Sequence, residues 1–201
     1  MKLIIISGPS GSGKTRLSKK ILKILKHGII LNTDNYYKTG IISNLFSNLV
    51  VSYFDRKISF NFKLFKKDLN FILKNGFSSY SYKYNFKKKS IKKLYKKTQN
   101  IRYVIIEGIF GREILRSFPD KNCIFIKLNI KKQTCMNRAI KRDFIERGKS
   151  KSIAKKDFLK AWELFHNNKN ENDSKDKVKK IVLKNEKDIK KLQKKITKIV
   201  N

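Results

Sequence analysis

Residues 8–15 read Gly-Pro-Ser-Gly-Ser-Gly-Lys-Thr and match the phosphate-binding pattern G-x-x-x-x-G-K-[ST] at every fixed position. An apolar run at residues 3–6 comes directly before this loop, and apolar residues at helical spacing follow it at 17–25. A loop between a buried strand and a helix can surround the phosphates of a nucleotide with backbone N–H groups. A glycine-rich turn without a ligand is the alternative, and the flanking strand and helix argue against it. The sequence therefore predicts a nucleoside triphosphate site.

The loop also supplies side chains that a bound triphosphate needs. Lys14 adds a positive charge for the phosphates, and the hydroxyl of Thr15 can ligate Mg²⁺. We expect the nucleotide to contact Gly8, Ser10, Gly11, Ser12, Gly13, Lys14 and Thr15.

The chain of 201 residues is long enough for one α/β domain with a substantial core, and we expect residues 1–201 to form a single domain. No apolar run approaches the roughly 20 residues that a membrane span requires. The apolar stretch 3–6 is also shorter than the roughly 7–15 residues of a signal-peptide core. A buried first strand explains it better, so we expect a cytoplasmic protein without a membrane partner.

The formal net charge of +35 is typical of proteins that bind nucleic acid. However, the 50 cations comprise 42 lysines and only 8 arginines, and they are spread along the chain. Arginine is the residue that reads base edges and clamps phosphates, and a compositional drift towards A/T-rich codons would produce the same excess of lysine. We therefore expect no specific nucleic-acid partner, only weak and salt-sensitive binding to polyanions.

Cys123 and Cys135 are the only cysteines, and His27 and His166 are the only histidines. These residues do not have the spacing of metal ligands, so we expect reduced thiols and no metal site built from cysteine and histidine.

Five short apolar runs predict buried parallel strands, because they lack the clean alternation of half-exposed strands. They lie at residues 3–7, 29–33, 103–107, 123–128 and 181–183. Helical patterns occur at 14–26, 131–146, 153–165 and 186–200, and the polar stretch 166–180 predicts a solvated loop. Strands that alternate with helices predict an α/β fold. We expect a P-loop NTPase with a doubly wound, mainly parallel five-stranded sheet that binds ligands at the carboxyl ends of its strands.

The stretch between the second and third predicted strands, residues 34–102, is too long for a simple crossover. Apolar residues at helical spacing over 64–73 stop before Gly76, which predicts a helix with a glycine C-cap. Alternation over 80–86 predicts a half-exposed strand. We interpret residues 45–100 as an inserted segment that encloses an acceptor substrate beside the nucleotide.

Two carboxylates follow predicted strands, where ligands bind in such a fold. Asp34 follows the second strand and can accept the proton of an attacking hydroxyl or hold a Mg²⁺-bound water, although an aspartate there can also cap a helix. Glu107 ends the third strand, where a carboxylate can bind Mg²⁺ or simply end the strand before a glycine turn. The phosphate loop favours the metal role for Glu107.

Arginines gather near the end of the helix predicted over 131–146. Arg138, Arg142 and Arg147 are three of the eight arginines of the chain. Guanidinium groups can stabilise charge on a transferring phosphoryl group and exclude water when a lid closes. A solvated, charged helix face is the alternative, but the concentration of arginine favours a lid over residues 138–150.

Taken in order, these segments resemble the uridine kinase family of P-loop kinases, which are relatives of phosphoribulokinase. After the phosphate loop, that family carries an Asp-x-[FY]-Tyr element, an FDxPxxFD-like stretch, a PxYDF segment, an EGI strand end and an RDxxERGR lid. The corresponding segments here are residues 34–37, 54–61, 82–86, 107–109 and 142–149. The resemblance covers nearly the whole chain and rests on the order and spacing of these short matches.

The resemblance implies phosphoryl transfer from ATP, with Mg²⁺, to the 5′-hydroxyl of a pyrimidine nucleoside, uridine or cytidine. The catalytic residues that it implies are Asp34, as the base that faces the hydroxyl, with Lys14, Arg142 and Arg147. The implied Mg²⁺ ligands are Thr15 and Glu107. The implied acceptor contacts are Asp34, Tyr37, Asp55, Tyr84 and Arg142.

Four residues depart from the family pattern. Lys57 replaces the proline after FD, and Asn85 replaces the aspartate of PxYDF. Lys89 stands in place of a base-reading histidine, and Lys149 replaces the last lid arginine. Because lysine does not reproduce an imidazole or the fork of an arginine, another small hydroxylated acceptor stays open. A GTPase, a nucleic-acid-associated ATPase and assembly into a homo-oligomer also stay open at this point.

Overall fold

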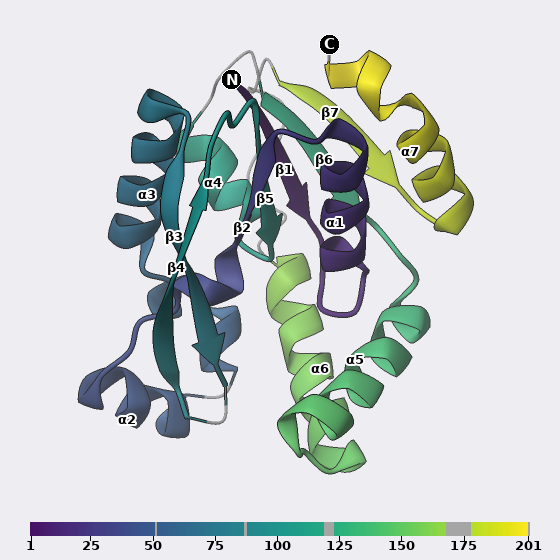
Figure 1. Cartoon of the computed structure of the whole chain (residues 1–201). Helices are drawn as coiled ribbons and strands as arrows, with labels where there is room; N and C mark the ends of the chain where they lie inside the picture. The colour runs from purple at the N-terminus through teal and green to yellow at the C-terminus, as the bar shows by residue number, and fades with distance from the viewer. Residues whose placement is uncertain (51, 87, 119–122, 168–177, 201) are drawn as a thin grey trace.

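The computed structural model describes residues 1–50, 52–86, 88–118, 123–167 and 178–200. Its centre is a five-stranded sheet in the order β2-β5-β1-β6-β7 (Figure 1). The strands are β1 (Lys2–Ser7), β2 (Gly28–Asn32), β5 (Tyr103–Gly108), β6 (Cys123–Leu128) and β7 (Lys179–Leu183). All neighbouring strands pair in parallel, which confirms the five predicted strands. The central strand β1 leads into the phosphate loop, at the point where the sheet order reverses.

Helices cover both faces of the sheet, which is therefore doubly wound as predicted. They are α1 (Lys14–Leu25), α3 (Phe62–Asn75), α4 (Gly111–Ser117) and α7 (Glu186–Val200). Leu3 and Ile5 of β1 belong to the core shared with α3 and α4, whereas Ile4 and Ile6 belong to the core shared with α1 and α7. Figure 1 shows these helix pairs on opposite sides of the sheet.

Two further helices, α5 (Lys132–Arg147) and α6 (Lys151–Asn167), extend beyond the carboxyl ends of the strands (Figure 1). They pack against each other, with Ala154 and Phe158 of α6 buried. Their position lets α5 cover the phosphate loop. Within the described ranges, no helix combines the length and the apolar composition of a membrane span.

The expectation that all five strands are buried on both faces is wrong for β7. Val182 is 50% exposed and only Leu183 of this strand is buried. The reason is that β7 is an edge strand, which pairs only with β6. Most of the solvated loop predicted at 166–180 lies outside the described residues.

The segment between β2 and β5 contains short helical turns, two helices and a hairpin. These elements are η1 (Thr33–Tyr36), α2 (Ile41–Leu49), η2 (Tyr53–Asp55), η3 (Lys57–Ser59), α3, β3 (Ser78–Asn85) and β4 (Ser90–Thr98). The predicted helix and its C-cap are confirmed, since Gly76 ends α3 with φ 70°. The predicted strand 80–86 corresponds to β3, which pairs antiparallel with β4. Strand β4 was not predicted from the sequence, because the lysine pairs of this strand interrupt the alternation that marks a strand.

Phe65 of α3 is fully buried in the core under the sheet, whereas Phe71 of the same helix is 44% exposed. We expect Phe65→Ala to lower the free energy of unfolding by about 3–5 kcal/mol, because it removes a buried ring and leaves a cavity. Phe71→Ala is the matched control and should cost about 1 kcal/mol. Equilibrium urea unfolding measures both values. Equal losses in the two variants would contradict this packing of α3.

Candidate active site

The phosphate loop joins β1 to α1 and lies directly against α5. Gly11 and Gly13 adopt φ values of 74° and 95°, in the left-handed region that favours glycine. A Cβ atom at Gly11 would lie 2.1 Å from the carbonyl oxygen of Cys135, so only glycine allows this contact with α5. At Gly13 the nearest atom to such a Cβ is Arg138 Nη1, 3.9 Å away. This side of the loop is therefore open to a ligand.

The polar groups of the loop fit a bound phosphate. Lys14 Nζ donates a hydrogen bond to the Pro9 carbonyl (3.0 Å), which holds the ammonium group over its own loop. Desolvation lowers the pKa of Lys14, whereas the nearby carboxylates of Glu107 and Asp34 favour its charged form. Ser12 Oγ is buried and has no hydrogen-bond partner among the described residues. A buried hydroxyl without a protein partner fits a site where a ligand oxygen completes the bonding.

Thr15 and Glu107 form the pair expected to serve Mg²⁺. The Thr15 hydroxyl donates to Glu107 Oε1 at 2.9 Å, and Glu107 is only 2% exposed. Burial raises the pKa of Glu107, and the charge of Lys14 opposes this shift. Hydroxyl and carboxylate oxygens are ligands that Mg²⁺ prefers, so this donor set fits the ion.

Asp34 lies in the turn η1, directly after β2. Asn32 Oδ1 accepts a hydrogen bond from the backbone N–H of Asp34 (2.8 Å), so Asn32 and not Asp34 caps the turn. The carboxylate of Asp34 instead accepts a hydrogen bond from the Tyr37 hydroxyl, 3.2 Å from Oδ1. This bond fixes the direction in which Asp34 points while leaving its second oxygen for another proton donor.

Four aromatic rings form a cluster next to Asp34, which we call the aromatic cluster. The ring centre of Tyr37 lies 5.0 Å from that of Phe54, 5.3 Å from Tyr84 and 5.9 Å from Phe86. Burial raises the pKa of Tyr37, and it raises that of Tyr84 to about 12. Both hydroxyls are therefore protonated near neutral pH and can donate hydrogen bonds.

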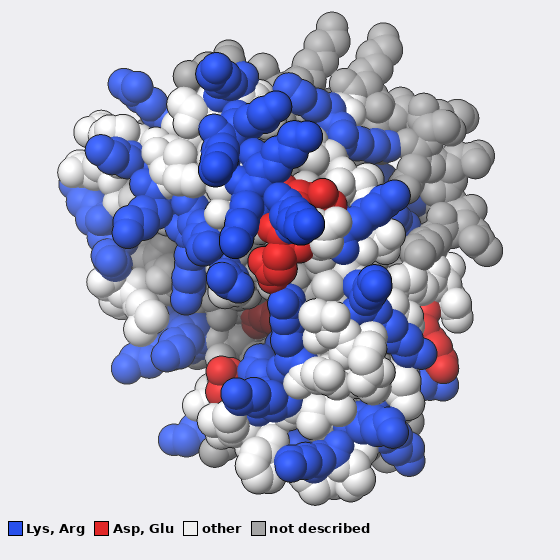
Figure 2. All heavy atoms as spheres, turned by 90° about the vertical axis from the view of Figure 1, so that its right-hand side faces the viewer, with Lys and Arg blue, Asp and Glu red and all other residues white. Residues whose placement is uncertain are grey.

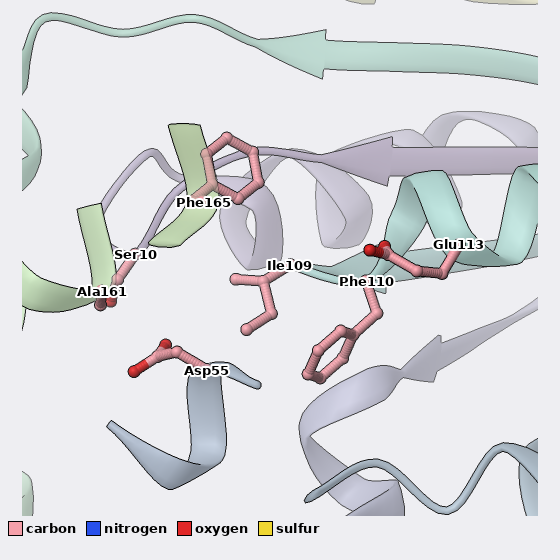
Figure 3. A pocket seen from close by; sticks show the side chains of 7 residues that line it. All are labelled: Ser10, Asp55, Ile109, Phe110, Glu113, Ala161 and Phe165. Atoms are coloured by element: carbon pink, nitrogen blue, oxygen red, sulfur yellow. The ribbon is translucent and has the colours of Figure 1, made fainter. Parts of the chain in front are cut away.

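A pocket lies between the phosphate loop, η2 and α6 (Figure 3). Ser10 and Asp55 line it together with Ile109, Phe110, Glu113, Ala161 and Phe165. Burial and the charge of Asp34 raise the pKa of Asp55 to about 7, whereas Arg147 and Lys149 oppose this shift. Asp55 can therefore accept or donate a hydrogen bond near neutral pH, in a pocket that reaches the phosphate loop.

Asp143 holds the two lid arginines and was missed as a site residue in the sequence analysis. Its carboxylate is buried, and its Oδ1 accepts from Arg142 Nε at 2.8 Å while its Oδ2 lies 3.4 Å from Arg147 Nη1. Arg142 Nη2 also donates to Ser10 Oγ of the phosphate loop (3.1 Å). The Arg147 guanidinium lies 4.0 Å from the ring centre of Phe86. Asp143 thus directs one arginine to the phosphate loop and the other to the aromatic cluster.

Two of the residues that depart from the family pattern have acidic partners. Lys57 Nζ lies 3.4 Å from Glu113 Oε1 at the edge of the pocket. Lys149 Nζ lies 2.6 Å from Asp157 Oδ2, which ties the end of the lid to α6. Asn85 accepts the backbone N–H of Lys88 (2.9 Å), so its side chain stabilises the hairpin turn.

A separate groove runs from the phosphate loop along α1 and α7. Lysine and arginine cover much of the face of the molecule that Figure 2 shows. The groove starts at Gly13, where Glu186 Oε1 lies 2.9 Å from Arg138 Nη2 and 3.9 Å from Arg16 Nη1. A triphosphate on the loop therefore has two directions in which to extend, along this groove or into the pocket of Figure 3.

The predicted site residues come from six separate segments and converge at the carboxyl edge of the sheet. The phosphate loop, η1, η2, the end of β5 and α5 each contribute at least one of them. Tyr84 reaches the same region from β3 through its ring contact with Tyr37. Phe54 and Phe86 were not among the predicted site residues, although both lie within the family motifs. Pairing of an aromatic ring with Arg147 is a tertiary contact that no local pattern predicts.

The sequence and the fold of the chain resemble those of known proteins. A family model described as "Phosphoribulokinase / Uridine kinase family" matches residues 3–168. The uridine kinase of Borrelia duttonii is 28% identical over 163 residues, which cover 80% of this chain and 76% of the relative. The uridine kinase of Borreliella burgdorferi is 31% identical over 153 residues, 74% and 70% of the two chains.

Among solved structures, the chain resembles YFH7 of Saccharomyces cerevisiae, described as a candidate P-loop containing kinase with a circular permutation. The TM-score is 0.69 at 12% identity, and the match covers 92% of both chains. This likeness concerns the fold, which is that of a P-loop kinase.

The raised pKa of Asp55, about 7, predicts a pH-dependent stability. In the unfolded chain an aspartate has a pKa of about 3.9. Between this pH and about pH 7 the folded chain therefore binds more protons than the unfolded chain. Because of this difference, the stability of the fold decreases as pH rises through that range. Asp55→Asn removes the ionisation. We therefore expect the difference in melting temperature, variant minus parent, to be larger at pH 8 than at pH 5.

Thermal unfolding at both pH values measures this difference. Glu163→Gln is the control, because this α6 carboxylate is 61% exposed and its variant should follow the parent at both pH values. If the melting temperatures of Asp55→Asn and of the parent changed by the same amount between the two pH values, this result would contradict the raised pKa of Asp55.

Proposed function

The chain belongs to the phosphoribulokinase/uridine kinase family and is thus a P-loop phosphotransferase that uses ATP; we propose that its acceptor is the 5′-hydroxyl of a pyrimidine nucleoside, uridine or cytidine. The observation that carries this proposal is the double contact of Tyr37. Its hydroxyl donates to Asp34, and its ring belongs to the aromatic cluster. An acceptor whose hydroxyl faces Asp34 would therefore have its planar base beside aromatic rings.

On the nucleotide side, the loop N–H groups and Lys14 would hold the phosphates, while Thr15 and Glu107 would ligate Mg²⁺. When bound, ATP would supply the γ-phosphoryl group, and Mg²⁺ would neutralise part of the charge of the phosphates. The groove along α1 and α7 would take the base and ribose of the nucleotide, which keeps them apart from the acceptor.

On the acceptor side, Asp34 would take the proton of the 5′-hydroxyl on Oδ2, because Oδ1 already accepts from Tyr37. Asp55 and Tyr84 would hydrogen-bond the nucleoside. Arg142 would lie beside the transferred group through its contact with Ser10, and Arg147 would cover the acceptor through its contact with Phe86. Such a site acts mainly by positioning and by electrostatic stabilisation.

One observation favours a second acceptor class. The carboxylates of Asp55 and Glu113 both line the pocket, and Lys57 pairs with Glu113 at its edge. A different small alcohol with hydrogen-bond donors would also fit these groups. The relatives described as uridine kinases favour the nucleoside.

The test is incubation of the protein with ATP, Mg²⁺ and a panel of nucleosides and small alcohols, read by the mass of the phosphorylated product. We expect uridine or cytidine monophosphate as the main product. Phosphorylation of a non-nucleoside alcohol alone would overturn the nucleoside proposal while leaving the kinase assignment intact.

Asp34→Asn keeps the shape of the side chain but removes the base. We expect phosphoryl transfer to fall by about 10²–10⁴-fold while ATP affinity changes little, because general-base catalysis contributes on that order. Lys14→Ala is the comparison variant and should weaken ATP binding as well as turnover. Full activity of Asp34→Asn would show that another group takes the proton.

Asp143→Asn tests the positioning of the lid arginines. We expect kcat to fall by up to about 10²-fold, because both guanidinium groups lose their anchor and misplaced groups cost rate on that order. If Asp143 acts through these two arginines, it should have little further effect in an Arg142→Gln/Arg147→Gln background. Equal effects of Asp143→Asn in both backgrounds, measured as kcat in a double-mutant cycle, would instead indicate a general structural role.

A further inference from the structure

Asp68 of α3 is a buried carboxylate with no part in the binding and transfer steps proposed for the site. It is 5% exposed, and each of its two oxygens accepts a hydrogen bond from a different tyrosine. The Tyr36 hydroxyl donates to Oδ2 at 3.2 Å, and the Tyr80 hydroxyl donates to Oδ1 at 2.9 Å. We call these three side chains the Asp68 bridge. The bridge joins η1, α3 and β3, which are separate in the sequence.

Both ends of the Asp68 bridge continue directly into the acceptor side of the site. Tyr36 lies in η1, two residues after Asp34 and directly before Tyr37. Tyr80 lies on the same face of β3 as Tyr84, because side chains alternate along a strand and these positions are four residues apart. The distance from Asp34 to the aromatic cluster therefore depends on how η1 and β3 are held together.

Two further contacts hold η1 against β3. Asn35 Oδ1 accepts a hydrogen bond from the backbone N–H of Tyr84 at 3.1 Å. The ring centre of Tyr36 lies 5.6 Å from that of Tyr82. The Asp68 bridge adds α3, which lies beside the β3–β4 hairpin in Figure 1 and packs in the core on one face of the five-stranded sheet. The bridge therefore ties both η1 and the hairpin to the centre of the fold.

A carboxylate is an expensive side chain for a contact that serves packing alone. Burial raises the pKa of Asp68, and the hydrogen bonds from Tyr80 and Tyr36 oppose this shift. Burying a charge is unfavourable unless hydrogen bonds compensate for the lost water, so an apolar side chain would fill the same space at lower cost. The carboxylate adds direction instead, because its two oxygens only accept and each one fixes the position of one hydroxyl.

We propose that Asp68 is a positioning residue for phosphoryl transfer, which sets the distance between Asp34 and the acceptor contacts on the β3–β4 hairpin. This inference rests on the proposed function, since it takes Asp34 as the base and Tyr84 as a contact of the acceptor. Asp68 would act through Tyr36 and Tyr80 rather than by contact with the acceptor. Holding both tyrosines on one carboxylate brings the acceptor hydroxyl and the base to the same place.

Asp68→Asn keeps the shape of the side chain but leaves it with a single acceptor oxygen. With ATP and uridine as substrates, we expect kcat/KM for uridine to fall by about 10–10²-fold, because small displacements of reacting groups cost rate on that order. The loss should include a higher KM for uridine, whereas KM for ATP should stay unchanged. A purely structural role would lower the apparent kcat through loss of folded protein and leave both KM values unchanged, and this result would overturn the proposal.

Tyr80→Phe removes one hydroxyl of the bridge and keeps the ring, so it disturbs the packing less. Tyr95→Phe is the matched control, because Tyr95 lies opposite Tyr80 on β4 and is 80% exposed. We expect Tyr80→Phe to raise KM for uridine and to add little in the Asp68→Asn background, whereas Tyr95→Phe should behave like the parent. Equal effects of Tyr80→Phe in both backgrounds would show that it does not act through Asp68.

Backbone hydrogen exchange tests the bridge without turnover. We expect peptides that cover residues 33–37 and 78–86 to exchange faster in Asp68→Asn than in the parent, while the phosphate loop, residues 8–15, exchanges at the same rate in both. Unchanged exchange in the first two segments would count against the Asp68 bridge alone. Failure of the parent to phosphorylate uridine would instead count against the proposed function.

Discussion

The geometry of the site depends on two close approaches of the backbone that only glycine permits. Gly11 lies against the Cys135 carbonyl, which brings the phosphate loop onto α5, and a Cβ atom there would be 2.1 Å from that oxygen. A Cβ atom at Gly108 would lie 1.7 Å from Thr33 Oγ1, so the end of β5 can approach η1 only without a side chain. The first contact sets the distance from the loop to the lid arginines, and the second sets the distance from Glu107 to Asp34.

Burial and the charges of nearby residues then determine the ionisation of the carboxyl groups in the site. The chain has only 15 acidic residues against 50 cations, yet Asp34, Asp55, Glu107 and Asp143 all lie at this edge of the sheet. Burial raises the pKa of Glu107 and of Asp55, which on its own would favour neutral carboxyls. Lys14 opposes this at Glu107, and Arg147 opposes it at Asp55. The cations of the site therefore keep carboxylates available where phosphates and hydroxyls are to be bound.

The sequence predicts the parts of this arrangement that rest on local patterns. Apolar runs specify β1, β2, β5 and β6, because buried parallel strands need apolar side chains on both faces, and the phosphate loop and the acids after β2 and β5 follow from strand ends. The pattern cannot reveal Asp143, because an aspartate beside an arginine in a charged helix has the same composition whether it is buried or solvated. Nor can it reveal the contact of Phe86 with Arg147, which joins residues from β3–β4 and α5 only in the folded chain. The outward face of α2 also escapes it, since amphipathic spacing specifies an apolar side but not the direction in which this side points.

The direction of α2 links the surface of the molecule to its acceptor side. The helix lies in the chain between η1, which carries Asp34, and η2, which carries Asp55, and it packs against η2. Ser43 joins both ends of this connection, through the carbonyl of Lys38 after η1 and the hydroxyl of Tyr53 in η2. A short segment held mainly by such hydrogen bonds has little buried apolar area of its own, so its local stability is low compared with the sheet.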